Sequence, residues 1–127
     1  IDLKWHISIS HSFPYAVAII HKKLPVGIDI EKPVDKLVKL APRFLSPEEI
    51  DDANDDPVKL CVYWTGKEAI YKLNGKRGLS FRRDIRIHPF ELVKRDVIRS
   101  EFILNDRSVR LSLDYRELKS HIISYCI

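Results

Sequence analysis

Apolar and polar residues alternate at the start of the chain, from Trp5 to Ser10. This period of two is typical of a strand that is buried on one face. A continuous apolar run from Tyr15 to Ile20 predicts a second, more buried strand, and Phe13-Pro14 between them predicts a hairpin. A third strand is expected from Val26 to Ile30, although Asp29 interrupts its apolar series.

Helix signals follow the third strand. Apolar residues at helical spacing predict a short helix from Val34 to Leu40. Ala41-Pro42 should close it, because a proline disfavours helix at the residue before it. Ser46, Pro47 and Glu49 then form an N-cap, a first helical position and a capping box, which predict a second helix.

The longest helix has the clearest signals at both ends. Asp56 is its expected N-cap, Pro57 its first residue, and Gly75 its left-handed end. Beyond it, short runs rich in β-branched residues predict strands over 85–88, 97–104, 109–115 and 121–126, with a turn over 105–107. Early helices and a late antiparallel meander predict an α+β fold, with an antiparallel sheet packed against one long and one or two short helices.

Composition and charge fit one domain with an anionic or acidic partner. The chain has 127 residues, 45% of them hydrophobic, which is enough for one core. Its net charge of +4 suits a polyanionic ligand or an acidic protein, and nucleic acid would fit this charge as well. Cys61 and Cys126 lie in apolar contexts, which predicts buried, reduced thiols and a cytoplasmic location. No apolar run is long enough to predict a membrane span.

Two acids lie close together on the third predicted strand. Asp29 and Glu31 are two residues apart, so their side chains leave the same face, about 7 Å apart at the backbone. Two such carboxylates can hold a hard cation such as Mg²⁺. The alternative is an edge strand with a solvated polar face.

The long predicted helix carries a second charged group. A spacing of four places Trp64, Glu68 and Lys72 on one stripe, and Lys67 lies beside it. A carboxylate between two ammonium groups could join a metal ion and neutralise phosphate oxygens, as phosphoryl transfer requires. The alternative is a surface helix with a Glu68–Lys72 ion pair worth about 0.3–0.5 kcal/mol.

Three motifs occur in order: Ser10-His11-Ser12, the stretch GIDIE over 27–31, and the stretch WTGKEAIYK over 64–72. Together they resemble the signature of the 4'-phosphopantetheinyl transferase superfamily, in its larger two-half class of the surfactin-synthetase-activating type. The resemblance implies Mg²⁺ at Asp29, Glu31 and Glu68. It also implies coenzyme A contacts from Ser10, His11, Lys67 and Lys72, and catalytic roles for Glu68 and Lys72.

The same resemblance implies a reaction. Such enzymes transfer 4'-phosphopantetheine from coenzyme A to a serine of an acyl or peptidyl carrier protein and release adenosine 3',5'-bisphosphate. This is a holo-acyl-carrier-protein synthase activity. Lys72 would offset charge on the leaving phosphate. Either Glu68 or a metal-bound water would accept the serine proton, and the sequence leaves both open.

The resemblance also implies a division of the chain. Residues 1–127 would form one domain, with linking strands over 1–25 and the C-terminal half of the two-half enzyme over 26–127. The N-terminal half is expected to be absent from this sequence, so a complete site would need that half or an oligomer.

Two other functions compete with the enzyme. The first is a non-catalytic module of the same fold that binds coenzyme A or a carrier protein. The second is a nucleic-acid-binding domain, and the positions of the aromatic residues argue against it. Trp5, Tyr63, Trp64 and Tyr71 belong to strand and helix patterns and do not alternate with a basic stripe. Arginines and lysines at 76, 77, 82 and 83 form a basic cluster after the long helix, either solvated or in contact with phosphate or a carrier protein.

Overall fold

The computed structural model describes residues 5–75 and 78–127. Within them, two antiparallel sheets and three helices form the α+β fold that the sequence predicts. The smaller sheet is a hairpin of β1 (His6–Ser12) and β2 (Tyr15–His21). The larger sheet has the order β3 (Gly27–Glu31), β7 (His121–Cys126), β6 (Arg107–Leu118), β5 (Arg95–Leu104) and β4 (Ile85–Ile87).

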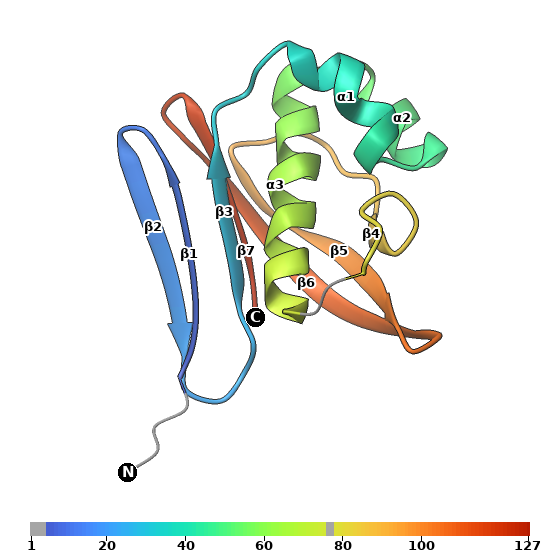
Figure 1. Cartoon of the computed structure of the whole chain (residues 1–127). Coiled ribbons are helices and arrows are strands. Elements are labelled where there is room, and N and C mark those ends of the chain that lie inside the picture. The colour runs from blue at the N-terminus through green and yellow to red at the C-terminus, as the bar shows by residue number, and fades with distance from the viewer. Residues whose placement is uncertain (1–4, 76–77) are drawn as a thin grey trace.

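The long helix α3 (Pro57–Asn74) lies against one face of the larger sheet (Figure 1). The short helices α1 (Lys36–Phe44) and α2 (Pro47–Ala53) lie beside its upper end in this view, and the β1–β2 hairpin flanks β3 on the other side. Most of the buried apolar side chains, among them Leu60, Ile70 and Leu113, fill the layer between α3 and the sheet. The remaining edge, where the hairpin, β3 and α3 meet, carries most of the predicted site.

The predicted ends of α2 and α3 are confirmed. Ser46 and Glu49 form a complete capping box at the start of α2. The Asp56 carboxylate accepts hydrogen bonds from the Val58 and Lys59 amides at the start of α3. Gly75 ends α3 with a φ of 66°, a left-handed conformation that glycine adopts without steric cost.

The predicted end of α1 is wrong. The helix continues through Pro42 to Phe44, four residues beyond the expected last residue, Leu40. Leu37, Ala41 and Phe44 are all buried and lie on one stripe of this helix. Burial of that stripe outweighs the one backbone hydrogen bond that Pro42 removes near the end of the helix.

The face of β1 that is buried is the polar one. The predicted alternation is present, but Ser8 and Ser10 are buried while Ile7 and Ile9 are 58% and 60% exposed. Ile20 of β2 lies opposite Ile7 and is also exposed. The hairpin therefore presents an apolar outer face that the described part of the chain leaves uncovered.

Both cysteines are free and buried, as predicted. Burial is the largest cause that raises the pKa of Cys126, to about 12, which leaves its thiol protonated and unreactive at neutral pH. Among the described helices, none combines the length and the apolar character needed to cross a membrane.

Two glycines allow α3 to lie close to the sheet. A Cβ at Gly27 would lie 1.8 Å from the Ala69 carbonyl oxygen and 2.9 Å from the Leu73 amide nitrogen, both backbone atoms of α3. A Cβ at Gly66 would meet the side-chain ends of Leu113 and Ile87 at 2.5 and 2.8 Å. Side-chain ends can move aside, whereas the helix backbone cannot do so without displacing α3.

We expect Gly27→Ala to lower the free energy of unfolding by about 3 kcal/mol or more, at the upper end of overpacking costs. Gly66→Ala should cost no more than about 2 kcal/mol, because alanine also favours the helix. Urea unfolding monitored by circular dichroism measures both values. Equal losses in the two variants would contradict the idea that backbone contact makes Gly27 the tighter position.

Candidate functional site

Serine hydroxyls join the hairpin to β3. Ser8 Oγ accepts a hydrogen bond from the Ile28 amide at 3.0 Å, and Ser10 Oγ accepts one from the Ile30 amide at 3.2 Å. The amides of successive residues point to opposite edges of a strand, so those of Ile28 and Ile30, two residues apart, share the edge that faces away from β7. The serines thus satisfy donors of β3 that would otherwise be buried without partners.

Asp29 is the most buried acid at this junction. Its Oδ1 accepts hydrogen bonds from Ser10 Oγ at 2.8 Å and from Lys72 Nζ at 3.4 Å. Its Oδ2 is buried without a hydrogen-bond partner, a state shared within the described residues only by His121 Nε2. Burial raises the pKa of Asp29, and the Glu31 charge adds to this, while the Ser10 hydrogen bond and the Lys72 charge oppose it.

Lys72 connects three elements through its ammonium group. Besides Asp29, its Nζ donates to the carbonyl oxygens of Ile28 at 2.9 Å and Ile9 at 3.2 Å. An ammonium has three donors, so these acceptors use all of them. A phosphate could bind Lys72 only by replacing one of these acceptors, and the 3.4 Å contact to Asp29 is the longest. Lys72 forms its ion pair with Asp29 and not with Glu68, so the surface ion pair considered as an alternative is not formed.

Glu31 and Glu68 complete the acidic group. Trp64 Nε1 donates a hydrogen bond to Glu31 Oε2 at 3.4 Å, and the Trp64 ring packs edge-on against Phe44. Burial is the largest cause that raises the pKa of Glu68, followed by the negative charge of Asp29, while Lys72 opposes the shift and Glu31 adds to it. Asp29, Glu31 and Glu68 therefore lie in one another's field.

The three acids nevertheless do not form a closed metal cage. In residues 5–75 and 78–127, no group of three or more His, Cys, Asp or Glu side chains lies close enough to hold a metal ion. The structure thus brings Ser10, Asp29 and Lys72 into direct contact, with Glu31 and Glu68 near but not converged on one point.

Lys67 lies elsewhere. Its side chain is 0% exposed, and its Nζ donates to Glu49 Oε1 at 2.7 Å and to the Phe81 carbonyl oxygen at 2.6 Å. Glu49 also accepts from the Ile87 amide and completes the α2 capping box. Burial lowers the pKa of Lys67, and the Glu49 charge opposes this. The structure gives Lys67 a role in packing and does not bring it to the acids, contrary to the expectation of a phosphate contact.

His11 and the basic cluster lie at the surface. His11 is exposed and follows Ser10 in a strand, so its side chain leaves the opposite face from the Ser10 hydroxyl. Arg82 and Arg83 are exposed after α3, while Lys76 and Arg77 lie outside the described residues. Within the described part of the chain, no hydrogen bond or ion pair joins His11, Arg82 or Arg83 to the acids.

A groove that the sequence did not predict begins beside Glu31. It has a volume of about 400 Å³ and is lined by Ser12, Glu31, Lys36 and the ring of Trp64, among others. A second, more apolar hollow of about 430 Å³ shares Leu37, Leu40 and Trp64 with it and reaches Phe81. The sequence motifs include its lining residues Ser12, Glu31 and Trp64 but not the groove itself, which depends on how α1 packs against α3.

Comparison with known proteins agrees with the motifs. A family model described as the 4'-phosphopantetheinyl transferase superfamily matches residues 25–126. This chain belongs to that superfamily. The matched range contains four predicted site residues of this chain, Asp29, Glu31, Glu68 and Lys72. Strands β1 and β2 precede the matched range.

Curated relatives carry the same description. The chain is 38% identical over 84 residues to the 4'-phosphopantetheinyl transferase psf-1 of Bacillus pumilus, covering 61% of this chain and 34% of that one. It is 39% identical over 84 residues to a 4'-phosphopantetheinyl transferase of Bacillus subtilis, covering 62% and 37%. Its identity to the 4'-phosphopantetheinyl transferase Sfp of Bacillus subtilis strain 168 is 35% over 91 residues, covering 65% and 40%. The matched segment thus spans between 34% and 40% of the length of these relatives.

We expect Lys67→Met to lower the free energy of unfolding by about 3–5 kcal/mol, because it leaves the buried Glu49 carboxylate without its cation. Arg86→Met is the control, since the Arg86–Glu48 ion pair is exposed and should contribute about 1 kcal/mol or less. Urea unfolding measures both. A Lys67→Met variant as stable as the control would show that the buried pair does not support the fold.

We expect Glu68→Gln to stabilise the protein at neutral pH. Folding raises the pKa of Glu68 above its ordinary value of 4.5. The wild-type fold therefore loses stability as pH rises from the ordinary pKa through the raised one, and glutamine, which does not ionise, removes this loss. The melting temperature should rise by a few degrees, since about 1 kcal/mol corresponds to about 4 °C in a domain of this size. Below the ordinary glutamate pKa the difference should disappear.

Melting curves from acidic to neutral pH measure this effect, with the exposed Glu117→Gln as control, for which we expect a change within about 0.5 kcal/mol. A Glu68→Gln variant that melts below the wild type at neutral pH would contradict the assignment of an electrostatically unfavourable carboxylate.

Proposed function

We propose that this chain supplies the acidic, metal-binding half of an enzyme that transfers 4'-phosphopantetheine from coenzyme A to a serine of an acyl or peptidyl carrier protein, releasing adenosine 3',5'-bisphosphate. The observation that carries the proposal is the Asp29 carboxylate, which is buried beside Lys72 and Ser10 with one oxygen left unpartnered. Family membership supplies the reaction class. The free, buried thiols agree with a cytoplasmic enzyme.

The donor set fits Mg²⁺. A buried carboxylate oxygen without a partner is unfavourable unless a donor or a cation satisfies it, and Asp29 Oδ2 is such an atom. Mg²⁺ commonly takes only one or two carboxylates and fills its other positions with waters and substrate phosphates, so an open acidic group suits it better than a closed cage. We propose Asp29, Glu31 and Glu68 as its protein ligands. When bound, the ion would neutralise charge on the pyrophosphate of coenzyme A.

The other side chains of the site would bind, orient and accept protons. The Ser10 hydroxyl fixes the Asp29 carboxylate through its 2.8 Å hydrogen bond, which uses its one hydrogen. Of the two residues expected at the coenzyme A phosphate, we therefore propose that His11 makes the contact, from the end of β1. Lys72 would exchange its long contact to Asp29 for a phosphate oxygen and offset charge on the leaving group. Glu68 has a raised pKa, which suits a group that accepts the proton of the carrier serine, with a water molecule as the other candidate.

The groove beside Glu31 offers room for the phosphopantetheine chain of coenzyme A or for part of the carrier protein. Its lining includes Trp64, which donates a hydrogen bond to Glu31, and the lysines Lys32 and Lys36. An apolar groove with lysines beside it complements an acidic protein that also has apolar contacts. We therefore propose that the carrier serine approaches from this side.

We further propose that a second α+β half completes the site. The matched segment spans between 34% and 40% of the length of the curated relatives. The outer face of the hairpin exposes Ile7, Ile9 and Ile20, which is unusual for a surface that contacts only water. Either a longer chain or a second molecule could bring the missing half to this face.

A non-catalytic module that binds coenzyme A or a carrier protein is the second candidate. Its support is the open arrangement of the acids, since no described group of three is poised to hold a metal ion. The two functions differ in a single observable, which is the release of adenosine 3',5'-bisphosphate.

The deciding experiment is the intact mass of an acyl carrier protein after incubation with this protein, coenzyme A and Mg²⁺, with and without a chelator. We expect a chelator-sensitive gain of one phosphopantetheine. Asp29→Asn and Glu68→Gln should reduce the rate at least about 100-fold, because each removes a charge that acts on the transferring phosphate.

Glu117→Gln is the control for loss of an acidic side chain and should transfer at the wild-type rate. If the chain alone is inactive, the assay is repeated with the chain extended at its N-terminus, and a gain there supports the proposal of a second half. Coenzyme A binding without mass gain by either protein would favour the binding module.

A further inference from the structure

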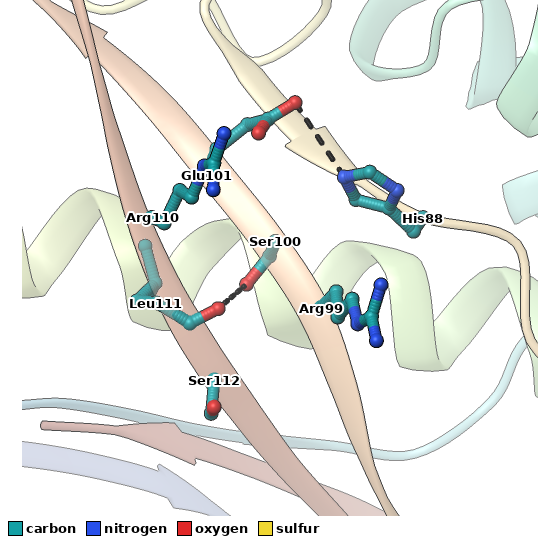
Figure 2. A pocket seen from close by; sticks show the side chains of 7 residues that line it. All are labelled: His88, Arg99, Ser100, Glu101, Arg110, Leu111 and Ser112. Carbon is teal, nitrogen blue, oxygen red and sulfur yellow. Dashed lines mark hydrogen bonds and ion pairs between the residues drawn. The ribbon is translucent and has the colours of Figure 1, made fainter.

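The outer face of the larger sheet is rich in arginine. Along β5, Ile98 and Ser100 are buried against the side of the sheet that α3 covers, whereas Arg99 is exposed on the other side. Arg110 on β6 and Arg86 on β4 are exposed as well. Figure 2 shows these strands with α3 behind them, so this face points away from α3 and its acids.

A hollow of about 540 Å³ lies on this face, where β4, β5 and β6 meet (Figure 2). Arg99, Arg110 and Ser112 line it together with His88 and Glu101. Its volume lies in the range of sites that hold small-molecule ligands. The strands β7 and β6 separate β5 from β3, so the hollow is distinct from the site of Asp29.

Neither Arg99 nor Arg110 forms an ion pair within the described residues, although Glu101 also lines the hollow. Glu101 lies 3.9 Å from Arg86 and 3.5 Å from His88, and Arg86 also pairs with Glu48 at 3.3 Å. The ion pairs and hydrogen bonds of residues 5–75 and 78–127 include no partner for the guanidinium of Arg99 or Arg110. The register pairs Arg99 with Ser112 and Glu101 with Arg110, which makes the two arginines diagonal neighbours about 7–8 Å apart.

From this arrangement we infer that the hollow binds a small phosphate-bearing anion. The two guanidinium groups share the hollow with one carboxylate, Glu101, whose ion pair is with Arg86, so the lining keeps an excess of positive charge that attracts an anion. Guanidinium groups bind phosphate through paired hydrogen bonds, and the Ser112 hydroxyl adds a donor from a third direction. Donor groups in three directions match the three free oxygens of a phosphomonoester better than the two oxygens of a carboxylate. This site does not depend on the proposed transfer activity.

The probe is inorganic pyrophosphate, titrated calorimetrically into the full chain at low ionic strength without Mg²⁺. We expect saturable binding that the double variant R99Q/R110Q weakens at least about tenfold, since one lost charged hydrogen bond corresponds to about that factor. The control is R95Q/R116Q, which removes the same charge from a directly paired site on the same two strands. We expect it to weaken binding less than about twofold.

Amide chemical shifts locate the ligand. Changes at 99–101 and 110–112 are the expected result. Changes confined to 27–31, equal weakening by R99Q/R110Q and R95Q/R116Q, or no saturable binding would each overturn the inference. Citrate serves as a carboxylate probe, and citrate bound as tightly as pyrophosphate would overturn the assignment of a phosphate group.

Discussion

Helix α3 crosses strand β3 so closely that Gly27 has no room for a side chain, since a Cβ there would lie 1.8 Å from the Ala69 carbonyl oxygen. This contact fixes the separation of the two elements that carry Asp29, Glu68 and Lys72. Because the helix is so near, Lys72 reaches the Ile28 carbonyl oxygen and Asp29 together, and water is kept from Asp29. A glycine without chemistry of its own thus determines the electrostatics of the acidic group.

Two buried charge clusters in this fold differ in how completely their atoms are satisfied. Glu49 accepts hydrogen bonds from Lys67, the Ser46 amide and the Ile87 amide, so its charge is fully compensated. Asp29 keeps one oxygen without a partner, and the neighbouring Glu68 has a raised pKa. The first cluster fits a structural role, because removing any part leaves an uncompensated charge. The second is unfavourable as it stands and becomes favourable when a cation or donor arrives, which is the property expected of a binding site.

Local signals in the sequence predicted most of the elements and fewer of the contacts. Caps at Ser46, Asp56 and Gly75 were readable because they depend on a few neighbouring residues. The end of α1 was not, because burial of Phe44 outweighs the local effect of Pro42. The spacing of Lys67 and Lys72 placed both near Glu68 on the helix, yet Lys67 turns toward Glu49 because α2 packs there. The sequence also did not predict that the serine face of β1 is the buried one, because alternation with a period of two defines two faces of a strand but not which of them is buried.

The serine hydroxyls between β1 and β3 have a consequence for how the molecule opens. A backbone ladder would join the two strands of the hairpin to the five of the larger sheet as one cooperative unit. Here the hydrogen bonds across the junction come from Ser8, Ser10 and the ammonium group of Lys72, and the Tyr15 ring packs edge-on against His121. Side-chain junctions break without unravelling either sheet. The hairpin can therefore behave as a separate unit of local unfolding, hinged at 22–26. Its departure would detach Ser10 from Asp29 while leaving Glu31 and Glu68 in place.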